Sequence, residues 1–199
     1  MIYPDNIKRL IDSFKSLPGI GDKTAERLAF SLLNFEKDDL TEFASSIIDV
    51  RDNIGRCKIC NNICDGEECI ICKNKNRNSD ILFVVENFKD IVLFEKIGIF
   101  NGYYHVLDGL ISPLNGVSPE DINIDKLIDR IRTSSVKEVV LALKPSIEGE
   151  TTMQYIKKML DGVNVKISRI ASGVPLGAEM EYLDNMTLEI AFEERINIS

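Results

Sequence analysis

The sequence of 199 residues has no tryptophan, a single histidine and no apolar run longer than five residues. A membrane-spanning helix needs about 20 consecutive apolar residues, so an integral membrane protein is excluded. The lone His105 excludes any site built from several histidines of one chain. The first residues, MIYPDNIKRL, carry charges where a signal peptide needs an apolar stretch, so we expect a cytoplasmic protein.

Positive charge is also scarce. Lysine and arginine number 24 against 32 acidic residues, which gives a formal net charge of −8. The chain therefore has no global basic field that could hold nucleic acid by non-specific attraction, and any nucleic-acid site must be local. Residues 53–79, with five basic and three acidic side chains, form the one formally positive section.

Hydrophobic residues make up 44% of the chain, which is enough for a folded core, and their pattern divides the sequence. Residues 1–53 show helical periodicity over 7–17, again after 22, and a third time after 38. Residues 54–79 are polar and rich in cysteine, and end in a run at 73–79 that we expect to be a linker. Residues 176–199 are expected to pack on the preceding section or on a neighbouring subunit.

Short apolar strands alternate with amphipathic helices in residues 80–175. We expect strands at 81–85, 103–107, 138–143 and 165–170, with helices from about 88 and near 124–132 and 150–160. The strands are almost continuously apolar, which is typical of a parallel sheet covered on both faces. The sequence therefore predicts an α/β main domain with a mostly parallel sheet, preceded by a helical module and a small cysteine-rich module.

The segment LPGIGDKTAERLAF, residues 17–30, places two glycines between the end of one expected helix and the start of the next. Gly19 and Gly21 allow backbone amides to approach a phosphate closely, and a helix N-terminus favours an anion. Lys23 and Arg27 are four residues apart and project from one face. The pattern resembles a helix-hairpin-helix that contacts DNA backbone; the alternative is a tight turn with solvated charges.

The run Gly21-Asp22-Lys23-Thr24 is not a nucleotide-binding P-loop. That motif requires a glycine immediately before its lysine, and an aspartate stands there. No strand is expected before the turn, so nucleotide hydrolysis at this place is not predicted.

Two CxxC pairs, Cys57–Cys60 and Cys69–Cys72, are separated by eight residues. Four thiolates suit one tetrahedral zinc ion with no position left open for catalysis. Metal binding would also supply folding energy to a segment that lacks an apolar core. A redox CxxC pair or an iron–sulfur cluster remains the alternative, and Cys64 is interpreted as a free thiol.

Acidic residues follow the first expected strand of the main domain. Glu86 and Asp90 lie in VVENFKD, and Glu148 lies in the loop KPSIEGE after the strand at 138–143. The carboxyl ends of parallel strands are where α/β sheets place their sites. This part of the chain resembles a Toprim domain, whose enzymes hold magnesium with a glutamate and a D-x-D motif. The D-x-D register here reads Lys144-Pro145-Ser146, which favours the fold and argues against catalysis.

The three modules, in this order, resemble the RecR family of recombination mediators over essentially the whole chain. Besides the hairpin and the paired cysteines, the matching stretches are VVENFKD, VLDGLISPLNGVSPEDI, KPSIEGE and ASGVPLGAEMEYLD. The resemblance implies a bacterial cytoplasmic protein of recombinational DNA repair without enzymatic activity. It implies a homo-oligomer, a dimer or a tetrameric ring, that works with RecO-like and RecF-like proteins to help load RecA.

Carried over by residue, the resemblance makes the hairpin positions Gly19, Gly21, Lys23 and Arg27 sequence-independent DNA contacts, and the four paired cysteines ligands of one structural Zn²⁺. From the surplus of acid in residues 80–199 we expect Glu86, Asp90 and Glu148 to form a docking surface for a basic partner. Two other hypotheses remain at this point. One is a magnesium-dependent Toprim nuclease or primase-like enzyme that uses the same three carboxylates, and the other is a protein adaptor that does not contact DNA.

Overall fold

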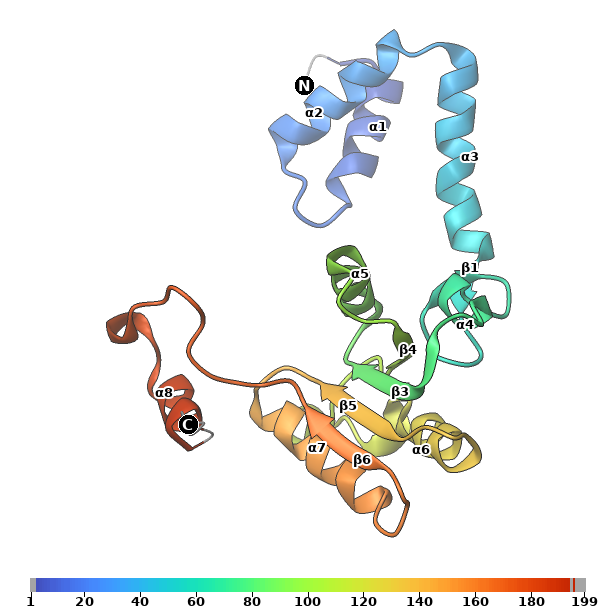
Figure 1. Ribbon diagram of the computed structural model, residues 1–199. Helices are drawn as coiled ribbons and strands as arrows, with labels where there is room; N and C mark the ends of the chain where they lie inside the picture. The colour runs from blue at the N-terminus through green and yellow to red at the C-terminus, as the bar shows by residue number, and fades with distance from the viewer. Residues whose placement is uncertain (1–2, 194, 196–199) are drawn as a thin grey trace. The chain divides into compact units, whose positions relative to one another are not determined.

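A computed structural model describes residues 3–193 and residue 195 (Figure 1). The chain divides into two compact units, residues 1–54 and residues 55–199. Each unit is described by itself.

In the first unit, the regular structure of residues 3–53 is helical. It contains α1 (Asp5–Lys15), α2 (Asp22–Ser31), the 3-10 turn η1 (Leu32–Asn34) and α3 (Lys37–Asn53). Ile11 of α1 packs against Ala25 and Ala29 of α2, and all three side chains are buried. Because alanine side chains are small, α1 and α2 can approach closely on this face. The helices predicted before and after the glycine turn are confirmed.

The third predicted helix, α3, differs from the other two in its burial. None of its side chains is buried within the chain, and apolar Phe43, Ile47, Ile48 and Val50 are all exposed. An amphipathic helix normally buries its apolar face against a partner. The apolar positions read from the sequence therefore form a surface on this unit.

The second unit is built on a parallel sheet of four strands. These are β3 (Asn78–Val85), β4 (Gly102–Val106), β5 (Glu138–Ala142) and β6 (Lys166–Arg169), in the order β4-β3-β5-β6. In register, Val84 lies between His105 of β4 and Leu141 of β5. The predicted parallel sheet is confirmed, and each of its strands lies within three residues of the expected position.

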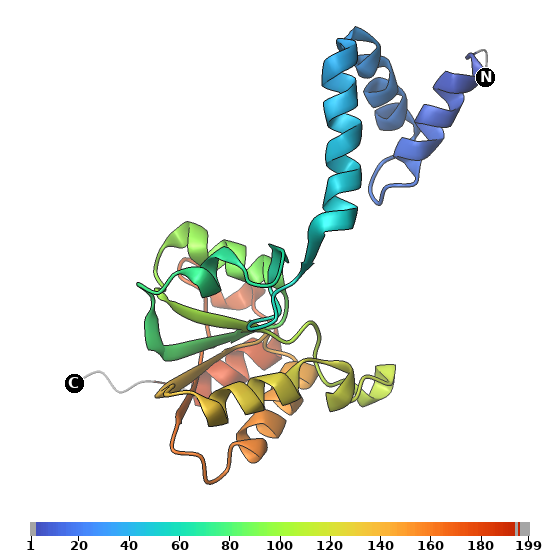
Figure 2. The same ribbon diagram turned by 90° about the vertical axis from the view of Figure 1, so that its right-hand side faces the viewer.

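Both faces of the sheet are covered, which explains the near-continuous apolar strands. Leu82 and Val84 point to a core shared with α6 (Ile124–Thr133) and α7 (Ile147–Met159). Phe83 and Val85 point the opposite way, toward α5 (Phe88–Ile97) and the cysteines. Figure 2 shows α5, in light green, on the opposite side of the sheet from α6 and α7, in yellow and orange.

The loop after β4 contains two 3-10 turns, η2 (Pro113–Asn115) and η3 (Pro119–Asp121). After β6 the chain forms a further turn, η4 (Met180–Tyr182), and a last helix, α8 (Asn185–Glu193). Apolar side chains of this last segment, among them those of Leu176, Met180 and Tyr182, are exposed.

Three short elements organise the cysteine-rich segment. They are β1 (Ile54–Arg56) and β2 (Ile63–Asp65), which form a two-stranded sheet, and α4 (Ile70–Lys73). The buried cysteines belong to the same apolar cluster as Phe83, Tyr104 and Val106 of the large sheet. The segment therefore folds against β3 and β4 and shares their core.

His105 is almost completely buried in β4. Its Nε2 lies 2.9 Å from the carbonyl oxygen of Asn123. A carbonyl oxygen only accepts hydrogen bonds, so Nε2 carries the proton and Nδ1 does not. Among the described residues nothing bonds to Nδ1. Burial, and secondarily the nearby Arg130 and Lys126, lowers the pKa of His105 to about 4.

We predict that His105 stays neutral in the folded protein until the pH approaches 4. Unfolded histidine has a pKa of about 6.5, so between these values the unfolded state binds a proton that the folded state lacks. The free energy of unfolding should therefore fall as pH is lowered through this window, by about 1.4 kcal/mol per unit from this group. Because the chain has one histidine, its ring resonance is unambiguous in an NMR titration. A midpoint near 6.5 in the folded protein would contradict the prediction, and a His105→Gln variant should lose this part of the pH dependence.

Candidate functional site

The four paired cysteines converge in the second unit. The sulfur atoms of Cys57, Cys60, Cys69 and Cys72 all lie within 4.8 Å of one another, and all four residues are buried. The Sγ atoms of Cys60 and Cys69 are 3.5 Å apart. The spacing of the two CxxC pairs in the sequence is thus matched by one compact cluster of sulfur atoms.

Local backbone structure aims the four sulfurs at one point. After the first pair, Asn61 adopts a left-handed conformation with φ of 62°, and its amide donates to the carbonyl of Cys57 at 2.9 Å. Cys69 is the N-cap of α4. The amide of Cys69 points at the sulfur of Cys57 at 3.4 Å, and the amide of Cys72 points at the sulfur of Cys69 at 3.5 Å. Such amide contacts stabilise thiolates.

The cluster is electrostatically prepared to hold a cation. Thiol hydrogen bonds from Cys60 and Cys72 lower the pKa of Cys69 far below its usual range. The same contact, with burial, raises the pKa of Cys60. Thiolates that lie this close together in a buried place repel one another, and a bound metal ion would relieve that repulsion.

The donor set fits zinc. Zn–S bonds of about 2.3 Å in a tetrahedron place the sulfurs about 3.8 Å apart. The observed spacing needs only small adjustments to reach this geometry. Four thiolates would complete the tetrahedron, so an ion bound here would be structural and would have no position open for a substrate.

Cys64 lies apart from this group. Its side chain is 8% exposed, and its thiol donates to the carbonyl of Gly66 at 3.2 Å. Burial raises the pKa of this thiol, which keeps it protonated. The structure thus places Cys64 beside the cluster but not in it.

The hairpin of the first unit displays its charged residues outward. Gly19 has a φ of 83°, which only glycine adopts readily, and this turns the chain between α1 and α2. Lys15 at the end of α1 pairs with Asp22 at the start of α2 at 2.6 Å, and Asp22 raises the pKa of Lys15. Lys23 and Arg27 are exposed on the side of α2 away from its buried alanines.

Gly21 is the N-cap of α2. It has no side chain that could compete with a bound phosphate for the amides of the first turn. The positive end of the helix dipole and the adjacent Lys23 both favour an anion at this position. The four hairpin residues singled out in the sequence therefore lie in one short stretch at this turn.

A cavity of about 430 Å³ lies at the carboxyl ends of β3 and β5. Glu86 and Asp90 line it on one side and Lys144 on the other, with residues 170–173 and part of α8 completing the wall. The Nζ atom of Lys144 lies 3.7 Å from Oε1 of Glu86. The lysine in the D-x-D register thus places its ammonium group beside the carboxylate that would hold a metal in a Toprim enzyme.

The other two acidic candidates have different surroundings. One oxygen of Asp90 accepts from the backbone amide of Asn87 at 3.1 Å and so forms part of the capping box of α5. Glu148 is half-buried in the first turn of α7 and is not among the residues that line the cavity. Its own backbone amide, then the Ser146 hydroxyl, lowers its pKa. The structure therefore brings Glu86 and Asp90 together and leaves Glu148 outside.

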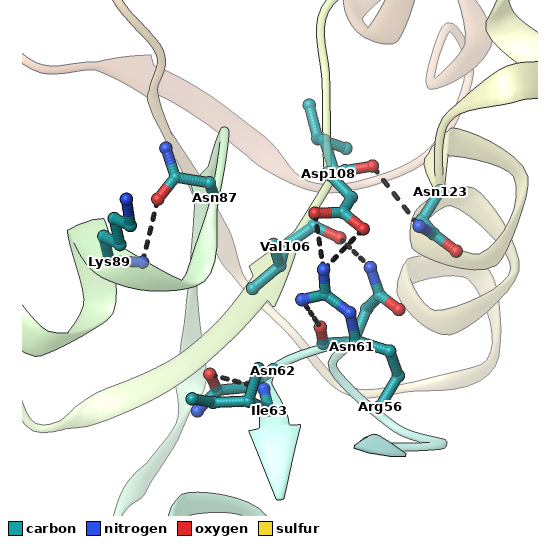
Figure 3. A network of polar contacts seen from close by, with 10 residues as sticks. Arg56, Asn61, Asn62, Ile63, Asn87, Lys89, Val106, Asp108 and Asn123 are labelled. Atoms are coloured by element: carbon teal, nitrogen blue, oxygen red, sulfur yellow. Dashed lines mark hydrogen bonds and ion pairs between the residues drawn. The ribbon is translucent and has the colours of Figure 1, made fainter. Parts of the chain in front are cut away.

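Sequence reasoning missed a polar network beside the cysteines (Figure 3). One terminal nitrogen of Arg56 donates to both carboxylate oxygens of Asp108 at 2.8 Å, and the other donates to the carbonyl of Asn61 at 3.3 Å. Asp108 follows the expected strand at 103–107, which is the same signal that singled out Glu86. The pairing with Arg56, 52 positions earlier in the chain, has no local signature.

Comparison with known proteins covers most of the chain. Residues 7–51 match the family model for the helix-hairpin-helix of RecR, residues 80–171 that for the Toprim domain, and residues 173–196 that for the RecR C-terminal region. The recombination protein RecR of Staphylococcus haemolyticus is 45% identical over 195 residues, which cover 98% of both chains. The recombination protein RecR of Staphylococcus aureus is 44% identical over 195 residues, which again cover 98% of both chains.

The chain belongs to the RecR family. The match extends through the hairpin, the cysteine cluster and the sheet, so the resemblance read from the motifs is confirmed. In the part of the chain that the structure describes, no helix is long and apolar enough to cross a membrane.

We predict that the protein binds one zinc ion per chain through the four clustered cysteines. Cys72→Ser should remove the ion and destabilise the cysteine segment, because a thiolate ligand and the shared core around it are lost. Cys64→Ser should keep the full zinc content, because that thiol is bonded to Gly66 outside the cluster. Metal analysis of the purified variants, with the parent alongside, measures both. Loss of zinc from the Cys64 variant would contradict the ligand assignment.

Proposed function

We propose that this member of the RecR family is a non-enzymatic mediator of recombinational DNA repair. The observation that carries the proposal is full-length similarity to proteins named recombination protein RecR, combined with a Toprim sheet whose D-x-D register reads Lys144-Pro145-Ser146. Its place of action would be the bacterial cytoplasm, at gaps and breaks in DNA.

In this proposal the hairpin binds DNA without reading its sequence. Amides at the start of α2 and the side chains of Lys23 and Arg27 would contact phosphates, which are the same for every base pair. The formal charge of −8 limits the affinity of a single subunit. Several hairpins acting together would overcome that limit, since linked sites raise the overall affinity without new contacts.

A homo-oligomer, a dimer or a ring of four, would bring such hairpins together. The exposed apolar side chains of α3 support it, because a soluble protein rarely leaves so many on one helix without a partner. The exposed apolar residues of the segment before α8 add a second surface of this kind.

The cavity at the sheet edge would be a docking site for a RecO-like partner, with a RecF-like protein as a further member of the assembly that helps load RecA. Residues 80–199 carry 12 basic and 19 acidic side chains, a balance that attracts a basic partner. Catalysis would need several carboxylates around two magnesium ions. Lys144 lies against Glu86, and Asp90 is engaged in capping α5, so the same residues suit docking better.

We predict that Lys23→Ala and Arg27→Ala weaken DNA binding to a similar extent for unrelated DNA sequences. Each lost phosphate contact should also lower the slope of log K against log salt concentration by about one. Fluorescence anisotropy over a series of salt concentrations measures both. Lys8→Ala is the matched control: it removes the same charge from α1, where Lys8 pairs with Asp5. If the hairpin variants bound DNA as the parent does, the hairpin would have a role other than DNA contact.

We predict that Glu86→Gln weakens binding of the RecO-like protein by about tenfold or more, because a carboxylate in a partly enclosed cavity has a strong field. Asp80→Asn, near the opposite end of β3, removes the same charge and should change little. Isothermal titration calorimetry gives the affinities. Incubation of the pure protein with labelled DNA and Mg²⁺ tests the enzyme alternative, which would be established by cleavage that Glu86→Gln abolishes.

A further inference from the structure

The end of the first cysteine pair lies beside the last residue of β4, one of the two edge strands of the four-stranded sheet. The amide of Val106 donates to the carbonyl of Cys60 at 2.9 Å, and the carbonyl of Val106 accepts from the side-chain amide of Asn61 at 3.2 Å. Both polar groups of the last residue of β4 are therefore hydrogen-bonded, one to Cys60, which ends the first CxxC pair, and one to Asn61, which follows it.

Arg56 and Asn61 lie on either side of this pair in the sequence. Figure 3 shows both of them near Asp108. The guanidinium group of Arg56 joins the carbonyl of Asn61 to the carboxylate of Asp108, and it lies 5.5 Å from the centre of the Phe88 ring. The Arg56 and Asp108 side chains are 40% and 39% exposed, so the pair is accessible to water but held by several contacts.

The turn at residues 106–108, which Arg56 contacts through Asp108, is hydrogen-bonded to the backbone of Val85 and Glu86 beside the proposed docking cavity. Asp108 adopts a left-handed conformation with φ of 65°, which is uncommon for a residue with a side chain. Its amide donates to the carbonyl of Glu86 at 2.8 Å, and the amide of Leu107 donates to the carbonyl of Val85 at 3.0 Å. Phe88, on the other side of Arg56, is two residues from Glu86.

We propose that Arg56 is a positioning residue that couples metal occupancy of the cysteine cluster to the 106–108 turn, and through it to the backbone at Glu86. Zinc fixes the first cysteine pair, the fixed pair holds Arg56 and Asn61 in place, and these two hold the turn. The significance for Glu86 rests on the proposed docking role, whereas the coupling itself does not depend on it.

Because of thermodynamic linkage, this coupling can be measured either as a change in zinc affinity or as a change in the stability of the turn. If the metal stabilises the Arg56–Asp108 contact, the contact must strengthen metal binding by the same factor. A residue far outside the cysteine segment, Asp108, should then change the affinity of the full-length protein for zinc. A role confined to local stability of the turn would leave the zinc affinity unchanged.

The first measurement is the affinity for Zn²⁺ alone, by competition with a chromophoric chelator. Arg56→Gln and Asp108→Asn should each weaken it about five- to tenfold, and the double variant should be little weaker than either single one. Asparagine tolerates the left-handed backbone, so Asp108→Asn removes the charge without forcing the turn to change. Circular dichroism verifies that each variant keeps its helices and strands.

Lys58→Gln is the matched control. Lys58 lies between Cys57 and Cys60 and pairs with Glu67, so its loss removes a positive charge from within the first CxxC pair without removing a contact of Arg56 or Asp108. Its zinc affinity should stay within about twofold of the parent value. Equal losses in Lys58→Gln and Arg56→Gln would show a general charge effect and overturn the proposal.

The second measurement is amide hydrogen exchange with and without zinc. Removing the metal should accelerate exchange at Leu107 and Asp108 in the parent, while the central strand β5 stays protected. In Arg56→Gln these two amides should exchange rapidly already, and zinc should slow them less. Unchanged exchange at the turn, or equal acceleration throughout the sheet, would overturn the proposal; neither readout involves DNA or a protein partner, so failure of the docking role would be seen separately.

Discussion

The burial of four thiols against the large sheet is the constraint on which the second unit depends. Residues 54–79 contain too little apolar side chain to fold alone, and the elements they form are only three or four residues long. Yet the cysteines join the same apolar cluster as Phe83, Tyr104 and Val106. Ligation of the sulfurs would therefore stabilise the packing of the sheet as well, and loss of either would expose the same apolar surface.

The cysteine segment also pairs with polar groups at the edge of the large sheet. β4 is one of the two edge strands of the sheet, and an uncovered edge offers unpaired amides and carbonyls to other chains. At its carboxyl end, Cys60 and Asn61 take the place of a neighbouring strand for Val106. The cysteine segment thus covers this edge of the sheet at Val106.

Elements that depend on local sequence patterns could be predicted from the sequence, and elements that depend on contacts distant in the chain could not. The first two helices and α5 have local periodicity, the four parallel strands are short apolar runs, and all were predicted close to their observed positions. The CxxC spacing carries its chemistry in four residues. By contrast, β1, β2 and α4 are too short for periodicity, and they exist because of contacts that are distant in the chain.

Charged side chains were the least predictable. Arg77 lies in the run expected to be a linker. Its side chain is buried and pairs with Glu95 at 2.6 Å. Glu148 and Glu150 both lie in the stretch KPSIEGE after β5, but Glu150 pairs with Arg169 at 3.1 Å, whereas Glu148 is half-buried and does not line the cavity. A long side chain can reach any of several partners, so its place is decided by tertiary structure and not by neighbours in the sequence.

The carboxyl edge of the sheet combines charged and apolar side chains around one cavity. A strand-end glutamate lies at the carboxyl edge of the parallel sheet, where β3 and β5 diverge in their connections. Lys144 offsets the charge of Glu86, and Asp90 stabilises the start of α5. The carboxylates that would hold two divalent ions are thereby engaged with groups of the protein itself. A cavity walled by these charges and by apolar side chains of α5 and α8 is better suited to a polypeptide than to a reacting phosphate, because a peptide offers both cationic and apolar groups to match it.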